Sequence, residues 1–151
     1  MNKPVPWKPV ILTTLIAGTL DLSAASIQAW FAAGISPRQL LIYIASGVWG
    51  KEAYTAGDKM LFFGTFFHFM IVFACVFCFF WIYPKWAFLQ YSILLNALLI
   101  GLTAWLITTQ IIIRLSSIPT QAPDWPNALL AIAILVVCIG LPTSFAAKKS
   151  S

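Results

Sequence analysis

The segment IAGTLDLSAA, Ile16–Ala25, is the middle of a long apolar stretch and carries an aspartate, Asp21, at its centre. The stretch runs from about Pro9 to Ala33. At about 1.5 Å per residue it is long enough, as a helix, to cross a hydrocarbon core of about 30 Å. It therefore predicts a membrane-spanning helix that has to accommodate an acidic side chain.

The composition of the whole chain agrees with a membrane protein. Of its 151 residues, 61% are hydrophobic and only 9% are charged, and the mean hydropathy is +0.91. A soluble domain carries about 25% charged residues. Because so few charges cannot cover a solvated surface, we expect an integral membrane protein whose main partner is the lipid bilayer.

Four apolar stretches are long enough to span a bilayer, at about residues 9–33, 60–83, 86–115 and 128–147. They predict an all-α membrane protein in which residues 1–151 form a single domain, an antiparallel bundle of four transmembrane helices. The second and third stretches are joined by YPKW, where Pro84 forbids a continuous helix and predicts a tight turn. Three prolines before the fourth stretch predict a short exposed loop.

A further short helix is expected between the first two spans, at about residues 37–48. Ser36 is suited to its N-cap and Pro37 to its first turn, and either Gly47 or Gly50 can end it. Its apolar residues recur at helical spacing. This pattern indicates an amphipathic helix at the membrane interface or over the end of the bundle, or else a re-entrant or packed loop helix.

The basic residues are scattered singly, which argues against nucleic acid as a partner and indicates signals of membrane topology. One side of the predicted bundle carries Lys3, Lys8, Lys85, Lys148 and Lys149, and the other carries Arg38, Lys51, Lys59 and Arg114. The larger count predicts that both termini are cytoplasmic. Aromatic belts are expected at Trp7, Trp81, Tyr83 and Trp86 on that side and at Trp30, Trp49 and Trp125 on the other.

Small and polar residues form a stripe along the first span and another along the second. The first stripe consists of Thr14, Gly18, Asp21, Ala25, Gln28 and Ala32, and the second of Gly57, Met60, Gly64, His68, Ile71, Cys75 and Cys78. Such stripes let helices approach closely in lipid and pair their polar groups. We therefore expect both to face the bundle, with Gly18, Ala25, Gly64 and Cys75 as helix-packing residues.

His68, the only histidine of the chain, is a candidate partner for Asp21. The two residues differ in predicted depth by about 6 Å, a gap that side chains or one water can bridge. Asn96 of the third span lies at a depth similar to that of Asp21. Because an ionised acid at the bilayer centre costs about 2.5 to 3.5 kcal/mol, Asp21 needs such a partner.

These residues support two interpretations. In the first, Asp21, His68, Asn96 and Gln28 form a ligand or proton site, since an imidazole can hold or pass a proton at neutral pH. In the second, Asp21 is hydrogen-bonded within the bundle and only fixes the register of the helices.

No cofactor, metal site or enzyme activity is expected. Cys75, Cys78 and Cys138 lie in apolar stretches, and with His68 they do not supply the four ligands of a structural zinc site. A haem held by two histidines would need a second copy of the chain. There is no hydrolase triad pattern, phosphate-binding glycine loop or metalloprotease motif.

Three short motifs in roughly the first 80 residues carry a family resemblance. They are G-T-L-D at Gly18–Asp21, A-S-G-x-x-G at Ala45–Gly50, and H-F at His68–Phe69. In these the chain resembles a family of small bacterial four-helix membrane proteins that has no assigned function. The resemblance implies a bacterial inner-membrane location, and it marks Asp21, Ala45, Ser46, Gly47, Gly50, Gly57, His68 and Phe69.

Two functions from different classes follow. The first is proton-coupled transport or ligand binding by an oligomer, with the Asp/His pair as the site. The second is a non-catalytic accessory or scaffold subunit of a larger membrane complex, in which the stripes serve only helix packing.

Overall fold

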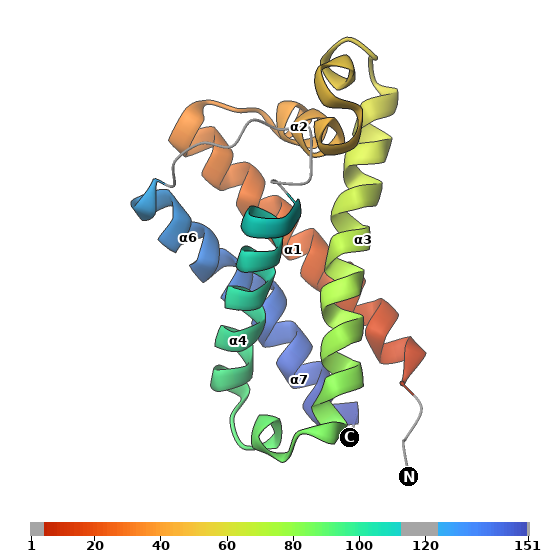
Figure 1. The fold of residues 1–151 in the computed structure, drawn as a ribbon, viewed down its shortest axis with the longest axis vertical. Coiled ribbons are helices and arrows are strands. Elements are labelled where there is room, and N and C mark those ends of the chain that lie inside the picture. The colour runs from red at the N-terminus through yellow and green to blue at the C-terminus, as the bar shows by residue number, and fades with distance from the viewer. Residues whose placement is uncertain (1–4, 113–123, 151) are drawn as a thin grey trace.

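The computed structural model describes residues 5–112 and 124–150, and every regular element in this part of the chain is helical. The all-α fold expected from the sequence is therefore confirmed. The α-helices, labelled in Figure 1, are α1 (Trp7–Ala33), α2 (Pro37–Trp49), α3 (Lys59–Ile82), α4 (Ile93–Leu106), α6 (Trp125–Leu135) and α7 (Leu141–Ser150). Short 3₁₀ and π segments join or extend them: η1 (Gly50–Tyr54), η2 (Tyr83–Lys85), η3 (Ala87–Gln90), η4 (Ile107–Ile112) and η5 (Val136–Gly140).

Three helices in the described residues are long and apolar enough to cross a membrane. They are Trp7–Ala33, Lys59–Lys85 and Trp125–Ser150, the last formed by α6, η5 and α7 together. Large apolar side chains such as Leu15 and Ile27 of α1 point away from the protein and stay about half exposed. Since water would make such a surface costly, these helices indicate a membrane protein.

The third predicted span does not begin where the sequence suggested. It was expected from residue 86, but α4 begins at Ile93, and the helix Ile93–Thr109 is shorter than the other three. Trp86 and Ser92 both have extended backbones, with φ −117° and −141°, so no helix can run through them. Instead the Ser92 hydroxyl caps α4 by accepting the Leu95 N–H at 3.2 Å.

The predicted end of that span, near residue 115, and the loop after it lie largely outside the described residues.

The aromatic belt predicted from the sequence is wrong at Tyr83, which is only 3% exposed and lies against Phe79 in the core. Trp49 is also a packing residue, since its ring lies 4.6 Å from that of Phe63. Tyr83 directly follows α3 and is the first residue of the 3₁₀ turn η2, and its ring packs against the last turn of the helix.

The helix α2 crosses the first turns of α3 at one end of the molecule (Figure 1). Ser36 is its N-cap, as predicted: its hydroxyl accepts the Gln39 N–H, and the Gln39 side chain accepts the Ser36 N–H at 2.8 Å. The helix ends at Gly50 rather than Gly47, because Gly50 has a φ of +59° that other residues rarely adopt. Arg38 forms an exposed ion pair with Asp58 and so joins the starts of α2 and α3.

Glycines set the closest helix contacts. A Cβ on Gly64 of α3 would collide with the backbone carbonyl of Leu41 in α2. A Cβ on Gly140 of η5 would collide with the backbone of Ala97 in α4, and one on Gly101 of α4 would collide with Val136. In lipid, where apolar surface gains little by burial, such close approach is a main source of helix association.

The last helix changes from α to π geometry over Val136–Gly140, directly before Pro142. Proline has no N–H, and its ring clashes with the carbonyl four residues earlier, here that of Cys138. The wider π turn, in which the Leu141 N–H bonds to the Val136 carbonyl, separates these groups. The sequence thus contains the cause of the irregularity, although the apolar pattern gave no sign of it.

Both ends of the described chain lie at the same end of the molecule, opposite α2 (Figure 1). The turn η2, which carries Lys85, lies there too, as does the last turn of α7 with Lys148 and Lys149. Lys85, Lys148 and Lys149 therefore lie at one end of the molecule, and Lys3, which was expected on the same side, lies outside the described residues.

The contact between α2 and α3 can be tested by substituting Gly64. We expect Gly64→Val to destabilise the protein by about 1 to 3 kcal/mol, because the new side chain overlaps the Leu41 carbonyl. The control is Ala74→Val, on the exposed face of the same helix, with an expected change within about 0.5 kcal/mol. Thermal unfolding in mild detergent would measure both, and equal midpoints for the two variants would contradict the packing.

Candidate functional site

The polar stripe of α1 faces the interior only in its first half. The buried residues of the helix are Val10, Thr13, Thr14, Ala17, Gly18 and Asp21. Beyond Asp21 the residues of the stripe become more exposed: Ala25 is partly buried and Ala32 is exposed. Asp21 is therefore the last buried residue of this face.

Gly18 is a point of close contact between α1 and α3. The His68 Nε2 lies 2.9 Å from the Gly18 carbonyl oxygen. Since a carbonyl oxygen only accepts, the imidazole donates through an Nε2–H, which fixes its tautomer when neutral. On the same glycine, a Cβ would collide with the ring of Phe69. The absence of a side chain at Gly18 thus makes room for Phe69, while the Gly18 carbonyl holds the preceding residue of α3, His68.

Asp21 lies one turn further along and is next to the same imidazole. Its Oδ2 is 3.9 Å from the His68 Nε2, and each of the two side chains is 11% exposed. This distance is within ion-pair range but longer than a hydrogen bond. A carboxylate and an imidazole from different helices therefore share one largely buried site, as the sequence suggested.

Of the three motifs that carry the family resemblance, the first, G-T-L-D, and the last, H-F, are thus in direct contact. G-T-L-D supplies Gly18 and Asp21, and H-F supplies His68 and Phe69. Phe69 was not on the polar stripe and was marked only by the resemblance. Its role in shaping the contact could have been suspected only from a glycine placed opposite an aromatic residue.

Asn96 does not pair with Asp21. Its Nδ2 donates to the Leu89 carbonyl and so ties η3 to the start of α4. The segment from η5 to α7 packs against both α1 and α4. Asn96 is 1% exposed, and its Oδ1 has no hydrogen-bond partner among the described residues, as is also true of the Thr143 hydroxyl.

Gln28 also lies apart from the pair. Its side-chain amide donates to the Asn127 carbonyl at 3.1 Å and so links α1 to the first turn of α6. Along α1 it is about 10 Å from Asp21. The stripe is therefore divided into a part at Asp21 that meets His68 and a part at Gln28 that links α1 to α6.

Two thiols belong to elements that pack against α1, Cys75 of α3 and Cys138 of η5. Cys78 is exposed. Within residues 5–112 and 124–150, no group of three or more His, Cys, Asp or Glu side chains could hold a metal ion.

Comparisons with family models, with curated proteins and with solved structures each gave no match.

The shared contact at Gly18 predicts strong coupling between Gly18 and Phe69. We expect Gly18→Ala to destabilise the protein by about 1 to 3 kcal/mol, because the new methyl group overlaps the Phe69 ring. Phe69→Leu in the same chain should recover much of this loss. The measurement is the midpoint of thermal unfolding of both single variants and the double variant.

The matched control combines Gly18→Ala with Phe66→Leu, a residue of α3 whose ring is about half exposed. Phe66→Leu should recover nothing, because its ring does not meet Gly18. Additive effects of Gly18→Ala and Phe69→Leu would contradict the contact.

Proposed function

We propose that this protein is an integral membrane protein that takes up and releases a proton at the Asp21–His68 pair in step with binding or transport of a charged ligand. The observation that carries the proposal is the pair itself. Two ionisable side chains from α1 and α3 approach to 3.9 Å, largely buried, in helices suited to a membrane. Ionisable residues at such positions commonly serve ion or proton pathways.

The charge of the pair explains why it would couple a proton to a ligand. With one proton shared between carboxylate and imidazole, the pair is neutral, either as two neutral groups or as an ion pair. Loss of that proton leaves a buried negative charge, and gain of a second leaves a positive one. An uncompensated charge in this environment is costly, so binding of a ligand of opposite charge would be favoured because it neutralises the pair. Loss of the proton therefore favours a cationic ligand.

The surroundings of the pair support a site that can change its state. The helix α1, which carries Asp21, packs against the segment from η5 to α7 as well as against α3, and η5 has π geometry. Such turns are frequent at functional sites. The His68 imidazole is held by the Gly18 carbonyl, which keeps its second nitrogen, Nδ1, available for a proton.

We place the protein in a bacterial inner membrane with four crossings and both termini in the cytoplasm. The fourth crossing would be α4 with η4, which together run from Ile93 to Ile112, or about 30 Å. The common end of the two termini and its lysines support this topology. The bacterial setting rests on the sequence resemblance.

Proton uptake at the pair can be tested before any ligand is known. Proteoliposomes on a solid-supported membrane should give a transient current after a pH jump, because a proton reaching the pair moves charge within the membrane. We expect the current in the wild type, and we expect Asp21→Asn and His68→Gln to lose most of it. The control is Asp124→Asn, the same change at an exposed residue before α6, and it should keep the current.

The result that would overturn the proposal is a wild-type current no larger than that of empty liposomes. A current of equal size in folded Asp21→Asn would do the same. Unfolding midpoints of all variants, measured alongside, separate loss of the site from loss of the fold.

A second function, that of an accessory or scaffold subunit, is favoured by the tight contact at Gly18. The Phe69 ring and the imidazole fill the space beside this glycine. In that case the pair would fasten α1 to α3 and carry no ligand.

The accessory function predicts that the protein purifies in mild detergent with other membrane proteins in a fixed ratio. Quantitative mass spectrometry of gently purified complexes measures that ratio. Purification as a stable homo-oligomer, with no other protein in constant proportion, would count against it.

A further inference from the structure

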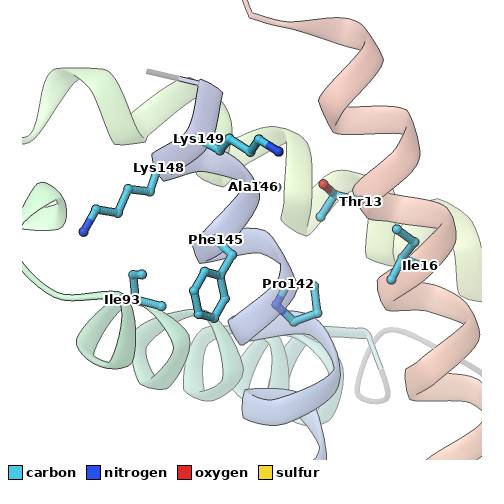
Figure 2. A pocket seen from close by; sticks show the side chains of 8 residues that line it. All are labelled: Thr13, Ile16, Ile93, Pro142, Phe145, Ala146, Lys148 and Lys149. Carbon is cyan, nitrogen blue, oxygen red and sulfur yellow. The ribbon is translucent and has the colours of Figure 1, made fainter.

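A groove of about 590 Å³ lies on the surface between α1, the start of α4 and the last turns of α7. Figure 2 shows Ile16 on one side, Ile93 on the other, and Pro142 and Phe145 between them. The Phe145 side chain is 59% exposed. The groove is therefore apolar along most of its length and open to the surroundings of the protein.

Two cations stand at the mouth of this groove. Lys148 and Lys149 belong to the last turn of α7, and both line the groove. In Figure 2 the Lys149 chain extends on the side of Thr13 in α1, and the Lys148 chain extends on the side of Ile93 in α4. None of the described residues that line the groove is acidic. Its mouth therefore carries positive charge above an apolar floor.

The groove follows the direction in which a lipid lies in a membrane. Its lysines are at the end of the apolar helix Trp125–Ser150, where that helix would leave the membrane. Pro142 is about 10 Å deeper along the helix. The polar mouth thus matches the headgroup level, and the apolar floor matches the level of the first part of an acyl chain.

We infer that this groove is a binding site for an anionic phospholipid. The phosphate lies at the mouth of the groove, where Lys148 and Lys149 attract it, and one acyl chain runs along Phe145 and Pro142 toward Ile16. Basic pockets between helices at the membrane surface suit anionic headgroups. A zwitterionic lipid gains less, because its own cation is repelled by the two ammonium groups. A free phosphate ion gains nothing from the apolar floor.

The site is separate from Asp21 and His68, and the inference does not depend on the proposed function. Native mass spectrometry of the full chain in mild detergent can test it with added phosphatidylglycerol, with phosphatidylcholine of the same chains, and with glycerol phosphate as the headgroup alone. We expect phosphatidylglycerol to bind much more tightly than the other two. Lys148→Gln with Lys149→Gln should weaken its binding about tenfold or more.

The matched control is Lys8→Gln with Lys85→Gln, which removes the same charge at the same end of the protein. It should leave phosphatidylglycerol binding within about twofold of the wild type, because screened charges away from the mouth contribute little. A third variant, Ala146→Phe, keeps both lysines but fills the groove, and it should also weaken binding.

Each alternative outcome would overturn the inference. Equal binding of the two phospholipids would remove the anionic specificity. Tight binding of glycerol phosphate would indicate an anion site without a lipid chain. Equal losses in the two double variants would indicate general charge attraction, and unchanged binding in Ala146→Phe would exclude the groove.

Discussion

The contact at Gly18 is the constraint on which the centre of this structure depends. The carbonyl of this residue accepts a hydrogen bond from His68, and the missing side chain makes room for Phe69. Together these two contacts hold α1 and α3 close enough for Asp21 to meet the same imidazole. A buried acid in an apolar helix is tolerable only beside such a partner. The residue that brings the pair together is therefore one that has no side chain.

Glycines also allow close approach at other helix contacts. Gly64 lets α2 lie on α3, and Gly101 with Gly140 lets α4 lie on the last helix. Large apolar side chains such as Leu15 and Phe62 point outward instead. In a soluble bundle the large apolar side chains point inward instead. The difference follows from the solvent, because burying a large apolar side chain gains little free energy in lipid, whereas close contact between helix backbones gains dispersion energy. Such packing holds a small bundle together with few large residues in its core.

Departures from regular helix lie where the chain has to change direction or accommodate proline. Two 3₁₀ turns lead from α3 to α4, and a π turn lies directly before Pro142. Asn96 of α4 donates to the Leu89 carbonyl of η3, so it stabilises this connection and does not contact Asp21.

The sequence by itself determined the all-helical class, the approximate extents of the apolar helices, and the capped helix that starts at Ser36. These depend on hydropathy, length and local hydrogen bonds, which neighbouring residues specify. It also placed Asp21 and His68 on facing stripes, because helical spacing reveals a face. Tertiary structure alone decided the rest: that α4 starts at Ile93, that Asn96 and Gln28 bond elsewhere, and that Phe69 fits over Gly18. The physical reason is that these features depend on which helices are neighbours and how closely their backbones approach, and no spacing within a single helix encodes that distance.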